Sequence, residues 1–274
     1  MPANAVPAGN HEGYPPRPPF PWQGWLAAVV VFGVLWWSAV GTGVNLRTLA
    51  GGWTEIVSFF HRLLPSAEHP WPLDYLPQIL VRLLETIKMA TAGAIIGSAL
   101  ALWFCLGGAR NLAAGKIVYN ISRALLNMIR TVPDLILATL FATILGIGPL
   151  PGVVALIVLA FGLVAKLLAD TLETIDPGPL EAITAAGGSN LERAIFAALP
   201  QVLPDFLAYT LYAFEVNVRS ASVLGLVGAG GIGMILQRDL AFMDYSRVGL
   251  IIATIFVTVL LIDGLSTFVR RRLV

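Results

Sequence analysis

The feature that most restricts the fold of this chain is a set of long stretches without any charged side chain. Residues 135–165 contain none over 31 positions, and none occurs from Trp22 to Leu46. A helix of about 20 apolar residues crosses a bilayer core about 30 Å thick. Only 12% of all residues are charged and 57% are hydrophobic, whereas a soluble domain carries about 25% charged residues. The sequence therefore predicts an all-α integral membrane protein rather than a soluble enzyme, a disordered chain or a free nucleic-acid binder.

Six stretches have the length and composition of membrane spans. The charge-free run at 135–165 is too long for one span, and the glycines and prolines at 146–152 break it into a hairpin. The predicted spans are 23–42, 83–106, 118–147, 153–174, 200–226 and 247–268. Within the second, Gly93 and Gly97 have the small-xxx-small spacing that lets another helix approach closely.

The predicted organisation has three parts. Residues 1–21 form a proline-rich tail that we expect to be disordered and cytoplasmic. Residues 22–79 hold the first span and an external loop with a short surface helix near 53–64, and residues 80–274 form the main membrane unit. A cleaved signal peptide is the alternative for the first span, although a proline-rich tail is an unusual start for one. Lys and Arg in the short loops favour both termini inside the cell.

The residues that bind cofactors or metals in other proteins are scarce. Cys105 is the only cysteine, and His11, His61 and His69 all lie outside the apolar stretches. The sequence therefore predicts no metal site, no cofactor and no catalytic residue in this chain. It also contains no phosphate-binding loop of the G-x-x-x-x-G-K-[S/T] type, so energy from ATP has to come through a partner.

The loop between the fourth and fifth spans carries the most informative motif. It reads Glu181-Ala182-Ile183-Thr184-Ala185-Ala186-Gly187 and ends in Leu199-Pro200. This resembles the E-A-A, G, L-P signature of the permease subunits of ABC importers. The resemblance implies that residues 176–198 form two short helices that dock onto a separate cytoplasmic ATPase, with contributions from Glu181, Ala182, Gly187, Leu199 and Pro200. Glycine suits a bend with positive φ, and proline suits the first turn of the next helix.

Two further stretches extend the resemblance to residues 80–274. Arg130-Thr131-Val132-Pro133-Asp134 is similar to the R-S-x-P element of these permeases, and residues 214–233 resemble the permeases of phosphonate importers, a branch that also serves phosphate and phosphite. The resemblance implies a type I importer core in the bacterial cytoplasmic membrane, surrounded by lipid. The implied partners are a second copy of the chain, two ATPase subunits that bind ATP and magnesium, and an external binding protein. It implies no nucleic-acid partner.

Ionisable side chains inside the spans have two possible interpretations. Arg130 and Asp134, Lys166 and Asp170, and Glu215 and Arg219 are each spaced i, i+4, so each pair can neutralise itself along one helix face. Charges within a membrane span also mark substrate pathways. On that interpretation the candidate path residues for an oxyanion are Arg219, Asn217, Ser220, Arg130 and Lys166.

A glycine-rich run, Gly228-Ala229-Gly230-Gly231-Ile232-Gly233, formally satisfies G-x-G-x-x-G. It follows a predicted membrane helix rather than a strand, so a dinucleotide site is excluded on context. The remaining alternatives are a nest of N–H groups for an anion and a close-packed turn. We expect a bend at the external mouth, with Gly228, Gly230, Gly231 and Gly233 as candidate gate residues.

Alternative functions are a permease for methionine or another small solute, a secondary transporter and a membrane-embedded enzyme. A secondary transporter is expected to show internal repeats or buried ligands for a coupling ion, and neither is evident. An enzyme requires clustered nucleophiles, bases or metal ligands in the spans, which the sequence lacks. Residues 214–233 favour the phosphonate branch over the methionine branch.

Overall fold

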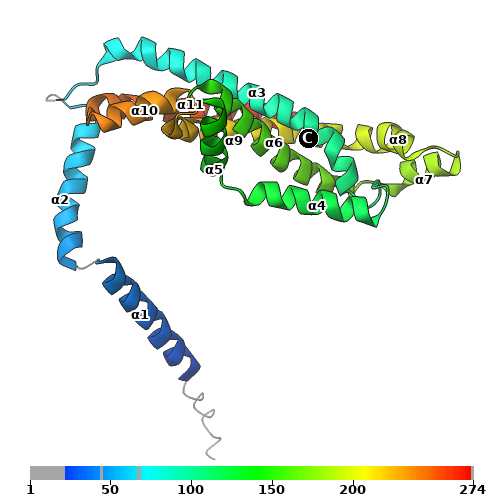
Figure 1. Cartoon of the computed structure of the whole chain (residues 1–274), viewed down its shortest axis with the longest axis horizontal. Coiled ribbons are helices and arrows are strands. Elements are labelled where there is room, and N and C mark those ends of the chain that lie inside the picture. The colour runs from blue at the N-terminus through cyan, green and yellow to red at the C-terminus, as the bar shows by residue number, and fades with distance from the viewer. Residues whose placement is uncertain (1–21, 44–45, 67–68, 273–274) are drawn as a thin grey trace, which may run out of the picture. The chain divides into compact units, whose positions relative to one another are not determined.

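The computed structural model describes residues 22–43, 46–66 and 69–272, and every regular element in these ranges is helical (Figure 1). The chain divides into two compact units, Met1–Ser58 and Phe59–Val274. The first unit holds α1 (Trp22–Thr42), which matches the predicted first span, and most of α2 (Leu46–Leu63). The predicted tail at 1–21 lies outside the described residues. The expected helix near 53–64 is present within α2, which begins earlier than predicted.

The second unit contains the remaining helices. Its long elements are α3 (Leu76–Gly108), α6 (Pro149–Leu172), α9 (Leu199–Leu224) and α11 (Tyr245–Arg270). Shorter ones are η1 (Leu73–Tyr75), α4 (Lys116–Thr131), α5 (Asp134–Leu145), α7 (Pro177–Ala185), α8 (Asn190–Glu192), η2 (Arg193–Ala198), η3 (Gly225–Val227) and α10 (Ile232–Ala241). Five helices in the described part of the chain are long and apolar enough to cross a membrane, and α4 with α5 makes a sixth if the pair is one span. The predicted all-α membrane architecture is therefore confirmed.

The third predicted span, 118–147, is not a single helix but two helices. The structure has α4 and α5 with an angle of 87° between them. Pro133 causes this break, because it lacks an N–H and disfavours helical backbone at the residue before it. Val132 is accordingly extended, with φ −79° and ψ 121°. The bend also means that Arg130 and Asp134 lie on different helices, so the ion pair expected from their i, i+4 spacing does not form.

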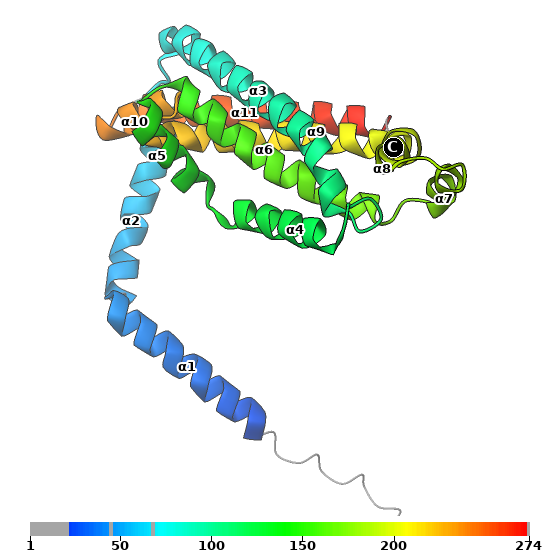
Figure 2. The ribbon, with the colours of Figure 1, turned by 45° about the vertical axis from the view of Figure 1, so that its right-hand side comes forward.

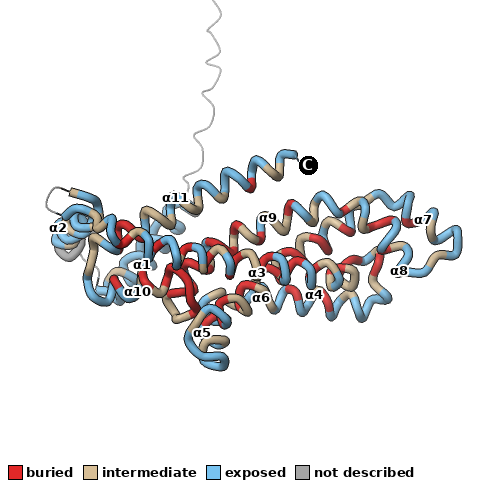
Figure 3. The backbone as a smooth tube through the Cα atoms, turned by 90° about the horizontal axis from the view of Figure 1, so that it is seen from above, coloured by how far each residue is buried: buried red, intermediate tan, exposed pale blue. Residues whose placement is uncertain are grey.

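The core of the second unit consists of α3, α6 and α9, which run side by side (Figures 1 and 2). Buried positions concentrate on these helices (Figure 3). Small residues set the spacing between them: a Cβ built on Gly97 would lie 2.6 Å from the carbonyl oxygen of Ile157 and 2.7 Å from Cβ of Ala160. A Cβ on Gly93 would lie 2.6 Å from Cβ of Leu156. The predicted role of Gly93 and Gly97 in close helix approach is thus confirmed.

Substituting Gly97 by valine is expected to destabilise the second unit. The added side chain meets the backbone of α6, which cannot move aside as a flexible side chain could, and overpacking of this kind typically costs about 1–3 kcal/mol. The matched control is Gly264→Val on α11, where nothing lies within 4 Å of an added Cβ. Thermal unfolding of both variants in detergent measures the difference. Equal unfolding temperatures for the two variants would contradict the packing described here.

Candidate functional site

The connection between α6 and α9 folds as two short helices joined at a glycine. Asp176 caps α7 by accepting a hydrogen bond from the N–H of Gly178 at 3.0 Å. Ser189 and Glu192 form a reciprocal capping box at the start of α8. Between them Gly187 has φ +82°, a left-handed conformation that suits glycine. The two helices and the bend expected for residues 176–198 are therefore present.

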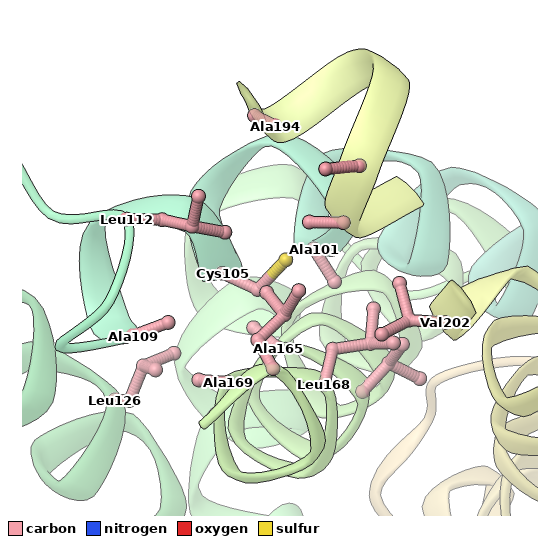
Figure 4. Close-up of a cluster of buried hydrophobic side chains, with 14 of the residues drawn as sticks. Ala101, Cys105, Ala109, Leu112, Leu126, Ala165, Leu168, Ala169, Ala194 and Val202 are labelled. Atoms are coloured by element: carbon pink, nitrogen blue, oxygen red, sulfur yellow. The ribbon is translucent and has the colours of Figure 1, made fainter. Parts of the chain in front are cut away.

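This connection is anchored to the core on one side. Ala194, Ala197 and Ala198 are buried in a cluster with residues of α3, α6 and α9. Figure 4 shows Ala194, Cys105, Leu168 and Val202 gathered within this cluster. Polar contacts add to the packing: Asn111 accepts a hydrogen bond at its backbone oxygen from Arg193 at 3.0 Å and donates from its amide to the Leu172 oxygen. The connection is thus fixed to the ends of α3 and α6.

The other side of the connection is exposed. Glu181, Ala182, Gly187 and Pro200 are exposed, and Leu199 is half-buried. Three large apolar side chains next to them are also open: Leu191, Ile195 and Phe196, the last with 69% of its surface accessible. Single exposed apolar residues are ordinary, whereas a group of them beside a motif indicates an interaction surface. The structure therefore brings all five predicted docking residues onto or beside one connection.

The glycine turn, residues 228–233, lies at the opposite end of the core from α7 and α8 (Figure 1). Gly228, Gly230 and Gly231 all have positive φ. The N–H of Gly231 donates to Oε1 of Glu85 at 3.3 Å, and that of Ile232 donates to Oγ1 of Thr86 at 2.8 Å. These α3 side chains occupy two of the N–H donors that an anion nest would use, which favours the close-packed turn.

The same turn also contacts the start of α6. The N–H of Gly148 donates to the oxygen of Gly228 at 2.9 Å. A Cβ on Gly152 would lie 2.3 Å from the oxygen of Ala229, and a Cβ on Gly233 would lie 2.2 Å from that of Ser222. The turn is therefore held between α3, α6 and the end of α9. The partners Glu85 and Thr86 were not identified from the sequence, since they are 146 residues away and belong to no motif.

Arg219 belongs to a charge cluster between α9 and α11. It pairs with Glu215, as its spacing predicts, and lies 3.8 Å from Asp263. Glu215 also pairs with Arg270 at 3.1 Å, and its side chain is only 7% exposed. A buried carboxylate requires such partners, because an unpaired charge out of water is costly. Arg219 is thus engaged by acidic side chains on two helices.

Lys166 belongs to a second cluster, which joins α4 to α6. Its Nζ lies 3.1 Å from Asp170, confirming the predicted i, i+4 pair. Asp170 also pairs with Arg123, and Arg123 lies 2.9 Å from Glu173. These four charged side chains form a network. It lies at the same end of the core as the α7–α8 connection.

The remaining candidate path residues converge at the α4–α5 bend. Asn217 is buried and donates to the oxygen of Ala90 at 3.3 Å, while Ser220 donates to Oδ2 of Asp134 at 2.9 Å. A cavity of about 160 Å³ lies beside them, with Arg130, Asp134 and Asn217 in its lining. The structure therefore brings together Arg130, Asn217 and Ser220, and places Arg219 and Lys166 in other clusters. Sequence reasoning assigned Asp134 only to an ion pair and missed its place beside the cavity.

Comparison with known proteins identifies relatives over most of the chain. The family described as binding-protein-dependent transport system inner membrane component matches residues 105–274. The phosphite transport system permease protein PtxC of Stutzerimonas stutzeri is 34% identical over 254 residues, which cover 91% of this chain and 90% of that protein. The phosphate-import permease protein PhnE of Mycolicibacterium smegmatis is 37% identical over 218 residues, 80% of this chain and 40% of that protein, so this chain spans less than half of that relative's length.

A shorter relative and a solved structure are also similar to this chain. The putative cryptic phosphonate transport system permease protein PhnE2 of Escherichia coli is 42% identical over 120 residues, 44% of this chain and 98% of that protein. The MetNI methionine ABC transporter in an inward-facing conformation superposes with a TM-score of 0.62 at 24% identity, over 73% of this chain and 98% of that one. At this identity the likeness shows the fold alone.

The two arginines around Glu215 are expected to substitute for each other. Replacing Arg219 or Arg270 singly by glutamine leaves the buried carboxylate with one partner, whereas replacing both leaves it with none. The double variant should therefore lose more stability than the sum of the single losses, by on the order of 1 kcal/mol. Thermal unfolding of the wild type, both single variants and the double variant measures this coupling. Strictly additive shifts would show that the cluster does not act as a unit.

Proposed function

The chain belongs to the family of binding-protein-dependent transport system inner membrane components, and on that basis we propose that it passes phosphonate, or the related oxyanions phosphate and phosphite, across the membrane. It is the membrane-spanning permease subunit of an ABC importer, not an enzyme. The observation that carries the choice of cargo is the similarity to PtxC over nearly the whole of both chains, together with relatives named for phosphate and phosphonate.

The energy source and the supply of cargo lie in partner proteins. Membership of this family implies a separate ATPase and a separate binding protein. We assign the ATPase to the α7–α8 connection, because Glu181, Ala182 and Gly187 are exposed there and the connection is anchored to the core behind them. This assignment puts the connection, and with it both chain termini, on the cytoplasmic side of the bacterial inner membrane. The glycine turn 228–233 then faces the exterior.

The working unit is proposed to contain two copies of this chain and two ATPase subunits. One chain offers a single docking connection, whereas an ABC motor closes two ATPases on each other, and a two-fold axis supplies the second connection. Closure of the ATPases draws the two connections together and opens the external mouth at Gly228, Gly230, Gly231 and Gly233. Release of nucleotide returns the pair to the inward-facing state, so ATP shifts the population between two conformations.

The path for the cargo is proposed to pass the α4–α5 bend. Arg130, Asn217 and Ser220 are close to the cavity there, and arginine offers a planar fork that suits a tetrahedral oxyanion. Arg219 and Lys166 already have carboxylate partners, so we rank them behind Arg130 as candidate path residues. Weak contacts are sufficient, because a binding protein supplies affinity and a strong site would retard release.

Methionine import is the alternative cargo. The likeness to the methionine transporter concerns the fold, and the more similar relatives are named for phosphorus oxyanions. A secondary transporter remains a remote alternative that leaves the exposed α7–α8 connection without a role. An ABC importer and a secondary transporter differ in their energy source, since a secondary transporter works without an ATPase.

Substituting Gly187 by valine, or Glu181 by lysine, is expected to uncouple ATP hydrolysis from uptake. Valine disfavours the left-handed backbone at Gly187, where φ is +82°, and lysine reverses a charge on the exposed docking face. We expect uptake to fall at least about tenfold, which corresponds to about 1.4 kcal/mol, while the subunit still inserts. The control is Gly43→Val, which imposes the same strain at φ +68° outside the connection. Normal coupling in both test variants would exclude the assigned docking role.

The proposed stoichiometry can be measured directly. Purification with the ATPase and native mass spectrometry should give two copies of this 29.2 kDa chain for every two ATPase subunits. The complex should remain intact at concentrations that support transport. A complex of one permease and one ATPase that is competent in transport would rule out the two-fold arrangement.

A further inference from the structure

We propose that an open pocket at the turn between α3 and α4 binds the phosphate headgroup of an anionic phospholipid such as phosphatidylglycerol. The pocket has a volume of about 490 Å³. We call it the headgroup pocket, and it is lined by Arg110, Ala113, Gly115, Lys116, Tyr119 and Asn120. It contains none of the candidate path, docking or gate residues, and only its placement in the cytoplasmic leaflet rests on the proposed function.

The headgroup pocket lies where the chain turns at one end of the core. α3 ends at Gly108 and α4 begins at Lys116, and both helices belong to candidate membrane spans. Arg193 of the docking connection donates to the oxygen of Asn111 at 3.0 Å, so the turn lies at the same end of the core as that connection (Figure 2). A short turn between two spans lies at the level of the lipid headgroups. With the connection on the cytoplasmic side, these headgroups are those of the inner leaflet.

Arg110 and Lys116 bring positive charge to the pocket that no carboxylate neutralises. Neither of them forms an ion pair within residues 22–43, 46–66 and 69–272. The neighbouring network around Asp170 pairs two cations with two carboxylates and is balanced in itself. The pocket therefore carries two uncompensated positive charges at the membrane surface, and basic pockets on the cytoplasmic side of membrane helices bind anionic headgroups.

Tyr119 holds the side chain of Arg110 in the pocket. Its hydroxyl accepts a hydrogen bond from Nε of Arg110 at 3.1 Å, and its ring centroid lies 5.4 Å from Cζ. The other face-to-cation contact of this ring is with Arg123, at 5.5 Å. Among the described residues the two terminal nitrogens of Arg110 have no hydrogen-bond acceptor. These nitrogens form the planar fork that suits two oxygens of a phosphate.

An exposed apolar stripe on α4 begins beside the pocket. Its members are Ile117, Ile121, Leu125 and Met128, which share one face of the helix. Lys116 and Asn120 precede two of these residues by one position, so the pocket and the stripe adjoin. The stripe is about 16 Å long at 1.5 Å per residue, close to half of a hydrocarbon core about 30 Å thick. An acyl chain of the same leaflet can therefore cover it, whereas free phosphate gains nothing from it.

The direct test measures lipid binding to the purified complex of the permease and its ATPase. The complex is titrated in detergent with phosphatidylglycerol or with phosphatidylcholine, and native mass spectrometry counts the bound lipids. We expect phosphatidylglycerol to bind at least about tenfold more tightly than phosphatidylcholine, and Arg110→Gln with Lys116→Gln to weaken its binding by about the same factor. Equal binding of the two lipids to the wild type would overturn the proposal.

The matched control is Arg271→Gln with Arg272→Gln, which removes the same charge directly after α11. These two arginines lie outside the pocket, so binding of phosphatidylglycerol should stay nearly unchanged. Equal weakening in both double variants would mean that the lipid responds to basic residues in general, and the headgroup pocket would be wrong.

The stripe is tested by Ile117→Ser with Ile121→Ser. Its control is Leu261→Ser with Leu265→Ser on α11, a pair with the same spacing and similar exposure. Only the α4 variant is expected to weaken binding of phosphatidylglycerol. No weakening in the α4 variant, or the same weakening in the control, would contradict a lipid that lies along α4.

A free phosphate is the other source of the same oxyanion. Inorganic phosphate added in excess should not displace phosphatidylglycerol from the wild type, because it makes no contact with the stripe. Displacement would overturn the lipid assignment. A photoactivatable group on the phosphatidylglycerol headgroup tests the site without any variant: labelling within residues 109–121 is expected, and labelling only elsewhere would contradict it.

None of these measurements requires transport of a cargo. If the complex imports phosphorus oxyanions but binds both lipids equally, the lipid site is wrong and the proposed function stands. If phosphatidylglycerol binds as expected while no phosphorus oxyanion is taken up, the proposed function fails and the lipid site stands.

Discussion

The close approach of α3 to α6 is the constraint on which the rest of the structure depends. Association of helices in lipid is driven by packing and hydrogen bonds rather than by the hydrophobic effect, so small residues at the interface have a large influence. Gly93 and Gly97 bring the α3 backbone into contact with α6. This contact places Asn217 of α9 within reach of backbone oxygens on both helices. Three helices are thereby fixed as one body, with the α7–α8 connection at one end and the glycine turn at the other.

The polar residues of the membrane unit follow from this arrangement. Where two helices pack with room for long side chains, charges neutralise one another, as in the cluster around Glu215 and the one around Asp170. At the α4–α5 bend the backbone itself prevents such pairing, and a cavity remains between Arg130 and Asp134. The pairs that close on themselves serve mainly to stabilise the helices, whereas Arg130 and Asp134 both line the cavity.

Much of the fold could be predicted from local signals in the sequence. The lengths of the apolar stretches predicted five of the long helices. The observed bounds of α1, α6, α9 and α11 lie within a few residues of the predicted spans, whereas α3 begins earlier than predicted. Gly187 identified the bend of the connection, because positive φ is a local property of glycine. The bend at Pro133 was missed, since the apolar length alone favoured one helix over 118–147. α10 was also missed, because it is short and contains Arg238 and Asp239. The contacts of Glu85 and Thr86 with the glycine turn depend on tertiary packing and leave no sequence signal.

The proposed function requires that this chain form the membrane path of an ATP-driven importer for phosphorus oxyanions. The most direct measurement is uptake of radiolabelled phosphonate, phosphate and phosphite into vesicles that contain the permease and its ATPase, with the binding protein outside and ATP inside. At least one of these anions should accumulate in the vesicles, and this accumulation should require all three components and stop when ATP is replaced by a non-hydrolysable analogue. Uptake that continues without the ATPase, or transport of methionine in place of every phosphorus oxyanion, would contradict the proposed function.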